Sequence, residues 1–200
     1  MSKTKSNLQK IFEFTGLLNK FRNITRTVLA NGTDREENDM EHSYMLAMQA
    51  DYIISLENLS LNREKVMTYC LVHDFVEVYA GDTPFHSTDK EYINSKKSRE
   101  TDSLKQITKE FPEHKNLLKT IHNYESRLDL ESRFVYALDK IQPIINIYLD
   151  NGRSWKRNGV DLGNLIKYKK DKVKFSPIVE KYWNELRDIL EKNQQSLFSK

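Results

Sequence analysis

Glycine and proline are scarce in this chain, and their scarcity restricts the fold more than any other feature. Among 200 residues there are six glycines and four prolines. A sandwich or barrel needs a turn about every ten residues, and these two residues usually build such turns. Helix interiors exclude both. The sequence therefore predicts an all-α fold, and its length fits a single helical bundle with one core.

The charge is balanced along the chain. Hydrophobic residues make up 38% and charged residues 30% of a chain with a formal charge of +3. The most basic run, residues 167–172, contains Asp171. This pattern is typical of a solvated mixed-charge surface, so we expect no nucleic-acid partner. A mildly positive protein would still attract a phosphate ester.

The ends and the single cysteine indicate where the protein resides. Cys70 lies in the apolar run 66–72, which predicts a buried thiol and no disulfide within the chain. The first residues lack an apolar segment, and no window approaches ~18 uninterrupted apolar residues. We therefore expect a cytoplasmic protein with no membrane partner.

Apolar residues recur at helical spacing in much of the chain. Residues 31–39 are polar and predict a loop, and the glycines at 152 and 159 bracket a predicted surface loop. Pro143 should kink the longest apolar helix. Asn62 is a candidate N-cap. Helices are predicted over residues 8–21, 40–56, 63–80, 90–111, 112–121, 130–147 and 177–190.

Histidine and aspartate interrupt these apolar helices at four places: His42, the pair His73-Asp74, Asp82 and Asp139. Burying a lone carboxylate costs several kcal/mol unless a cation or hydrogen bonds compensate it. Imidazole and carboxylate together suit a divalent metal. His73 and Asp74 project about 100° apart from the predicted helix 63–80, so a metal fits between them. His42 and Asp139 would complete the site from flanking helices.

Each of these residues also has an ordinary structural explanation. His42 alone is typical of an exposed helix start, and a His-Asp pair occurs by chance in many helices. Asp139 could pair with Arg133 or Lys140. The metal-site prediction depends on the order of the four residues and on their apolar context.

That order, His then His-Asp then Asp on helices, resembles the HD superfamily. Residues 35–43 are similar to the segment R-x-E-N-x-x-E-H-S of HD proteins allied to the 5′-nucleotidases. Residues 73–83 resemble H-D-x-x-E-x-x-x-G-D-T of the same group, and residues 137–143 resemble A-L-D-[RK]-x-x-P. The similarity covers roughly residues 10–165. It implies one HD domain over residues 1–200, with a core at about 10–165 and a C-terminal helix at about 177–195.

The resemblance also implies a role for each matching residue. Glu77 would transfer protons as a general acid or base, Asp82 would orient water or substrate, and Arg26 would contact the phosphate. The cofactor would be a divalent metal, one of Mn, Co, Mg or Fe. Its ligands would be His42, His73, Asp74 and Asp139.

The expected reaction is release of phosphate from (deoxy)nucleoside 5′-monophosphates. Thr27 follows Arg26 where deoxynucleotidases of this group carry tryptophan, and the loop between residues 26 and 35 is one residue longer, so the resemblance does not fix the sugar or base. The alternatives are an HD phosphodiesterase or a hydrolase of nucleoside polyphosphates or alarmones, and more remotely a non-catalytic helical binding module. A homodimer is also expected, because both end helices have surplus apolar positions and relatives often pair.

Overall fold

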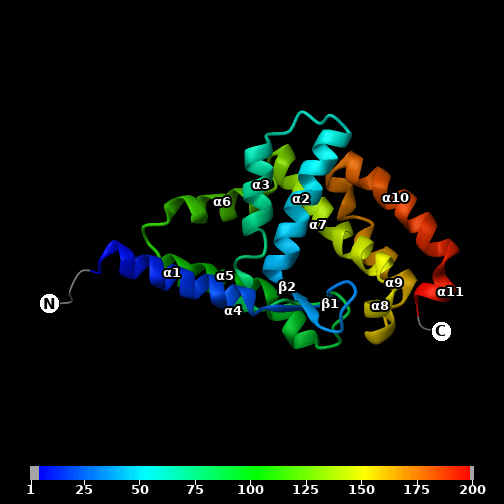
Figure 1. Cartoon of the computed structure of the whole chain (residues 1–200), viewed down its shortest axis with the longest axis horizontal. Helices are drawn as coiled ribbons and strands as arrows, with labels where there is room; N and C mark the ends of the chain where they lie inside the picture. Colours follow the sequence, from blue (N-terminus) through cyan, green and yellow to red (C-terminus); the bar gives the residue numbers. More distant parts are fainter. Residues whose placement is uncertain (1–4, 199–200) are drawn as a thin grey trace.

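The structure is a computed structural model that describes residues 5–198. It confirms the all-α fold, with helices packed around α7 and one short hairpin beside them (Figure 1). No helix in the described part of the chain is long and apolar enough to cross a membrane. The elements are α1 Asn7–Arg22, β1 Thr25–Leu29, β2 Glu36–Asn38, α2 Asp39–Leu56, α3 Arg63–Val72, α4 Glu77–Ala80, α5 Lys90–Glu110, α6 Lys115–Ser126, α7 Leu130–Leu149, α8 Arg153–Arg157, α9 Leu162–Lys169, the 3-10 helix η1 Val173–Phe175, α10 Pro177–Lys192 and α11 Gln194–Leu197.

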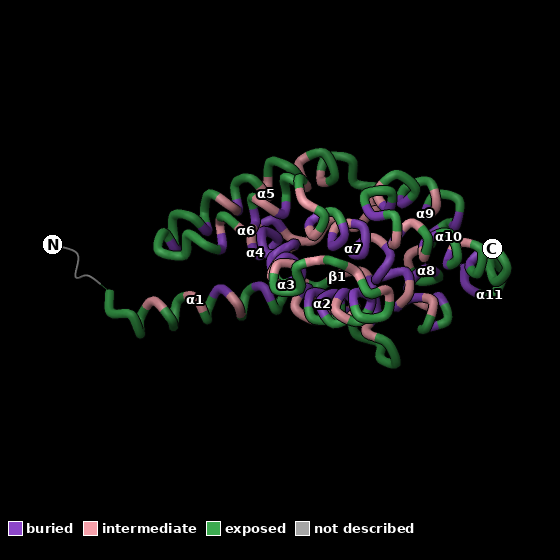
Figure 2. The backbone as a smooth tube through the Cα atoms, turned by 90° about the horizontal axis from the view of Figure 1, so that it is seen from above, coloured by how far each residue is buried: buried purple, intermediate pink, exposed green. Residues whose placement is uncertain are grey.

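Two clusters of buried side chains form the interior. The larger cluster lies around α7, with α2, α3 and the C-terminal helices packed on it. The smaller cluster joins α1, α5 and α6 to the α3–α4 junction. Figure 2 shows the buried backbone along α7 and the exposed outer faces of α1 and α5. The smaller cluster includes Val72, Phe75 and Val76. The larger one includes Val66, Tyr69 and Cys70, so the end of α3 lies where the two clusters meet.

The hairpin corrects only the end of the predicted loop at residues 31–39: residues 31–35 are turn and bend, residues 36–38 form β2, and Asp39 begins α2. β1 and β2 pair antiparallel, with Thr25 opposite Asn38. The Asn38 side chain then caps α2, accepting from the Glu41 backbone at 3.0 Å, while the Glu41 side chain accepts from the Asn38 backbone at 3.1 Å. A strand of three residues is too short to show an alternating pattern, so periodicity could not reveal it. The hairpin matters because β1 carries Arg26.

The predicted continuous helix over residues 63–80 is wrong in its middle. α3 ends at Val72, and residues 73–76 form a turn before α4. In this turn the Phe75 and Glu77 amides donate three residues back, to Val72 and Asp74 at 3.1 and 2.8 Å. The His73 side chain hydrogen-bonds through Nδ1 to the Cys70 carbonyl at 2.9 Å. In an ideal helix this carbonyl would accept from the Asp74 amide instead. His73 and Asp74 therefore lie at a helix end rather than within a helix.

The C-terminal part folds back onto α7 and the hairpin (Figure 1). The predicted surface loop between Gly152 and Gly159 is instead the short helix α8, whose Trp155 is buried. The Trp155 ring stacks on Phe198 with centroids 4.5 Å apart. α9 was also absent from the predicted helices, because the seven residues between Gly159 and the polar run 167–172 leave few apolar positions to show a period.

Candidate metal centre and its pocket

The four predicted ligands converge on one point. His42 comes from the first turns of α2, His73 and Asp74 from the turn after α3, and Asp139 from the middle of α7. Each offers one ligand atom, and these atoms all lie within 4.8 Å of one another. Both histidines and Asp139 are buried. A cluster of this size and composition can hold one divalent ion.

The hydrogen bonds of the two histidines orient their free nitrogens. His73 Nδ1 donates to the Cys70 carbonyl at 2.9 Å, and His42 Nδ1 donates to Gln142 Oε1 at 3.0 Å. Each Nε2 lone pair therefore faces the centre. His42 Nε2 lies 3.0 Å from Asp139 Oδ1, and His73 Nε2 lies 2.9 Å from Asp74 Oδ2. Lone pairs this close to carboxylate oxygens repel unless a cation lies among them, so the donor set fits a divalent metal.

Gln142 was missed by the sequence analysis. It is buried on α7 and holds the His42 ring. The signal was available, because Gln142 follows Asp139 by three residues in an apolar helix and so shares its face. A buried amide in that position needs a partner.

The charges of the cluster favour the protonation states that a metal requires for three of the four predicted ligands, His42, Asp74 and Asp139. Burial, together with the Arg26 charge, lowers the pKa of His42 to about 4. Burial alone would raise the pKa of Asp139, but Lys140 and His42 outweigh it and hold that pKa well below its usual range. His73 likewise outweighs burial and lowers the pKa of Asp74. Near neutral pH the cluster thus has a neutral His42 and two ionised carboxylates, as ligands must be. Burial would lower the pKa of His73, but Asp74 and Asp139 outweigh it and raise that pKa, so a metal would displace a proton from His73.

Arg26 connects this cluster to two further buried carboxylates. Its Nη1 donates to Asp74 Oδ2 at 2.9 Å and to Asp39 Oδ1 at 3.3 Å, and its Nε lies 3.5 Å from Glu37 Oε1. Within residues 5–198 its Nη2 makes no hydrogen bond, and the residue lines the pocket. The sequence analysis placed residues 37 and 39 in a polar loop, and only the fold shows them buried.

Glu77 and Asp82 lie on the same side of the cluster. Glu77 is 2% exposed, its Oε1 lies 3.4 Å from Lys96 Nζ, and its Oε2 has no hydrogen bond. Burial and the charges of Asp74 and Asp82 raise the pKa of Glu77 well above its usual value. Burial also raises the pKa of Asp82, which follows Gly81 at a positive φ of 73°. Burial and the neighbouring carboxylates therefore favour the protonated form of Glu77 more than in an ordinary glutamate, which suits a proton donor.

A pocket leads from the cluster to the surface and has two unlike walls. The polar wall contains Arg26, Glu77, Asp82 and Lys96. The apolar wall is formed by α7, α8 and α9, and its residues are Pro143, Ile144, Ile147, Trp155, Val160 and Leu165. A second opening reaches Asp74 and Asp139 from the side of α6, past Tyr124, Arg127 and Tyr136. The ligand cluster thus lies at the base of a pocket with room for a charged group and an apolar one.

Replacing Glu37 should change how the stability of the metal-free protein depends on pH. Burial raises the pKa of Glu37 to about 7 from 4.5, although Arg26 opposes the shift. The folded state therefore keeps a proton that the unfolded state releases, so this group's contribution to stability falls as pH rises from about 4.5 to about 7. Glutamine stays neutral at every pH. Between pH 4.5 and about 7 we therefore expect the free energy of unfolding of Glu37→Gln to rise by roughly a few kcal/mol relative to that of the parent.

The measurement is denaturant unfolding in a chelator at several pH values between 4.5 and 8. Glu64→Gln, at an exposed position in the first turn of α3, is the control and should follow the parent at every pH. A constant difference between Glu37→Gln and the parent would show that Glu37 does not hold a proton in the folded state.

Comparison with known proteins places the chain in a family. The family model of the HD domain matches residues 18–183. Human 5′-deoxynucleotidase HDDC2 is 29% identical over 141 residues, which are 68% of this chain and 66% of the human protein, just under two thirds of its length. The 5′-deoxynucleotidase hdd1 of Schizosaccharomyces pombe is 25% identical over 146 residues, 69% of this chain and 71% of that protein.

A solved structure agrees over nearly the whole chain. The crystal structure described as a predicted metal-dependent phosphohydrolase from Magnetospirillum magnetotacticum MS-1 superimposes with a TM-score of 0.80 and 26% identity, covering 97% of each chain. A conserved hypothetical protein from Pyrococcus furiosus, at 22% identity and a TM-score of 0.63, shares the fold over 90% of this chain and 99% of its own. From the extent of the family match, the chain belongs to the HD domain family.

Proposed function

We propose that the protein is a metal-dependent phosphomonoesterase that releases phosphate from (deoxy)nucleoside 5′-monophosphates. The observation that carries this proposal is the convergence of two imidazole Nε2 atoms and two ionised carboxylates at the base of one pocket. The names of the similar human and yeast proteins, 5′-deoxynucleotidases, support the substrate class.

In this proposal His42, His73, Asp74 and Asp139 hold one divalent ion, of Mn, Co, Mg or Fe. The imidazole and carboxylate donors accept any of these four. Such an ion supplies Lewis acidity, which polarises a phosphate oxygen and makes water more acidic. The other tasks fall to the side chains of the pocket.

Arg26 would bind the phosphate through Nη2, the guanidinium nitrogen that makes no hydrogen bond with residues 5–198. Its Nη1 remains on Asp74 and Asp39, so the same side chain fixes a ligand and faces the substrate. Glu77 would hold a proton at Oε2 for the leaving oxygen. Asp82, at the rim beside Glu77, would orient water.

The apolar wall accounts for the nucleoside. A phosphate at the cluster leaves the sugar and base to extend along Ile144, Ile147 and Trp155. Concave apolar surface beside a few polar groups is the usual form of a small-molecule site. Phosphate esters of small alcohols would leave this wall uncovered, so we expect them to be poor substrates.

Phosphate release from a panel of nucleotides tests the proposal. The purified protein, loaded in turn with Mn, Co, Mg or Fe, should release phosphate from nucleoside monophosphates. Triphosphates and cyclic nucleotides should react at least about tenfold more slowly. Turnover confined to triphosphates or cyclic nucleotides would move the protein to the polyphosphate or diester hydrolases. No turnover of any phosphate ester by metal-loaded protein would contradict the proposal.

Glu77→Gln should lower kcat by roughly 10²- to 10⁴-fold, the usual contribution of a positioned acid, without loss of metal. Glutamine keeps the shape of the side chain but cannot transfer the proton. Glu100→Gln is the matched control, because Glu100 is the other carboxylate on Lys96, at 3.3 Å. If Glu77→Gln and Glu100→Gln lowered kcat equally, the loss would be due to the disturbed Lys96 and not to the missing proton transfer.

A further inference from the structure

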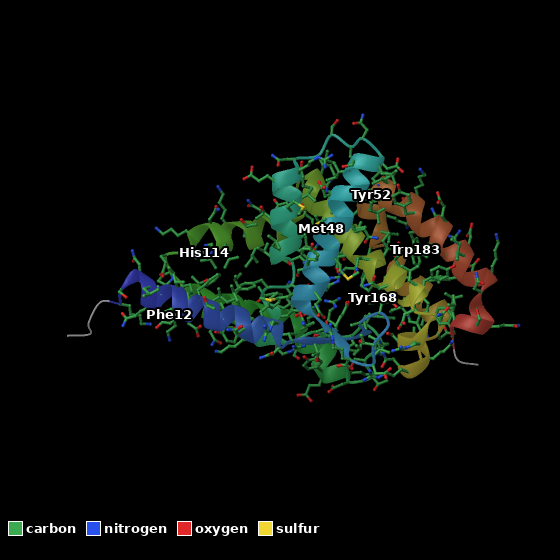
Figure 3. All side chains as sticks on the ribbon, in the orientation of Figure 1. Phe12, Met48, Tyr52, His114, Tyr168 and Trp183 are labelled. Atoms are coloured by element: carbon green, nitrogen blue, oxygen red, sulfur yellow. The ribbon has the colours of Figure 1, made fainter. Side chains whose placement is uncertain are left out.

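Lys169 is a buried cation without a counter-ion. It ends α9, lines the pocket and is 7% exposed. Within residues 5–198 its Nζ makes no hydrogen bond or ion pair, while its backbone carbonyl accepts from the Lys172 amide at 3.0 Å. Its ammonium group lies 5.5 Å from the ring centroids of Phe85 and Tyr168, two rings that stack on each other at 5.0 Å. Tyr168, the residue before Lys169 on α9, is labelled in Figure 3.

The two rings do not compensate this burial. A cation–π contact contributes roughly 0.5–2 kcal/mol, whereas taking an ammonium out of water costs several kcal/mol. The charge environment adds to the cost, because burial and the positive charges of Lys140 and Lys172 lower the pKa of Lys169 to about 7. The folded protein therefore keeps this lysine at a net cost, which an anion in the pocket would remove.

The other cations of the pocket already have carboxylate partners. Lys140 contacts Asp139, and Lys96 lies 3.4 Å from Glu77. Arg26 uses Nη1 for Asp74 and Asp39. Among the described residues that line this pocket, Lys169 is therefore the cationic side chain that no carboxylate already pairs with.

The position of Lys169 indicates which part of a ligand it meets. Lys169 lines the same pocket as Arg26 and the predicted metal ligands Asp74 and Asp139. Among the charged groups that act on it, Lys140 and Asp139 have the largest effects. An anion beside Asp139 is the reacting phosphate rather than a group on the base.

We propose that Lys169 binds the phosphate of the substrate together with Arg26, and so acts as a second phosphate-binding residue of this site. This inference rests on the proposed function for the identity of the ligand, a dianionic phosphate monoester. Its product, inorganic phosphate, presents the same oxygens and charge. Inorganic phosphate is therefore the probe that separates Lys169's role from turnover.

Calorimetric titration of Mn-loaded protein with inorganic phosphate tests this role. Lys169→Met keeps the length and apolar stem of the side chain and should weaken binding roughly 10- to 100-fold, the range for one charge-assisted hydrogen bond. Lys169→Arg should restore part of the affinity. Lys167→Met, at an exposed position on the same helix, should bind as the parent does.

A melting curve without phosphate distinguishes binding from a structural role. Removing an unpaired buried charge should leave the melting temperature of Lys169→Met equal to the parent's or higher, while affinity falls. A structural lysine would show the opposite, a lower melting temperature with unchanged affinity. In the unmodified chain, phosphate should also protect Lys169, but not Lys167, from reductive methylation several-fold.

Unchanged phosphate affinity in folded Lys169→Met, or no protection of Lys169, would overturn the inference. So would a parent protein that binds no phosphate. Failure of the nucleotide panel is a separate result: if no nucleotide is hydrolysed but phosphate binding still depends on Lys169, the anion site stands and the proposed function falls.

Discussion

Asp74→Asn is expected to remove the bound metal and to lower phosphate release by about 10³-fold or more. The Asp74 carboxylate lies 2.9 Å from His73 Nε2 and 3.9 Å from His42 Nε2, so it faces both imidazoles. Asparagine has the same size but no charge, and its NH₂ group would compete with the metal for the ring nitrogens. Lewis-acid stabilisation contributes several kcal/mol, and each 1.36 kcal/mol is about tenfold in rate.

Metal content by elemental analysis and phosphate release from a nucleoside monophosphate measure both effects together. Asp51→Asn is the control, because Asp51 is an exposed aspartate on α2 that pairs with Arg63. It should keep the parent's metal and activity. Full metal occupancy in Asp74→Asn, or more than about a tenth of the parental rate, would show that the ion binds elsewhere.

Gly152→Ala is expected to destabilise the protein by about 2–5 kcal/mol. Gly152 has a φ of 72°, where a side chain costs roughly 1–2 kcal/mol. A Cβ there would also lie 2.0 Å from the Leu197 carbonyl oxygen, which belongs to backbone and cannot rotate away. Displacing α11 would cost a further 1–3 kcal/mol or so and would disturb the Trp155–Phe198 stack behind the pocket. For a chain of this size the melting temperature should fall by roughly 5–20 °C.

Gly159→Ala separates the two causes. Gly159 also has a positive φ, 60°, but nothing lies within 4 Å of the position a Cβ would take. It should therefore lose only the conformational part, about 1–2 kcal/mol. Thermal unfolding of both variants provides the measurement. Equal losses would show that contact with Leu197 contributes nothing.

How much of the fold the sequence predicts depends on the length of each element. The long helices α1, α2, α5 and α7 were predicted from apolar spacing, because sixteen or more residues repeat the helical period several times. β2, α4 and α8 span three to five residues and give no period. The break after Val72 was missed for another reason: residues 66–78 are apolar enough to continue a helix, and the His73 side chain ends it by bonding to the Cys70 carbonyl.

The candidate site divides in the same way. His42, His73, Asp74 and Asp139 could be named from the sequence, because a charged or ligand-type side chain in an apolar segment has few physical explanations. Their proximity could not be derived from it, since it depends on how α2, α3 and α7 pack. Gln142 was within reach of sequence reasoning, while Asp39, Glu37 and Lys169 were not.

By itself, then, the sequence determined that the chain is helical and which side chains need a cation, because backbone period and the cost of burying charge are local properties. Only the tertiary structure decided where the other charges lie. Lys169 lies in a basic run that is typical of solvated surface, yet folding buries it in the pocket that Asp139 also lines. Asp39 sits in a polar segment, yet the hairpin brings Arg26 onto it. The charge balance of the pocket is set by contacts between residues far apart in the chain, and these exist only after folding.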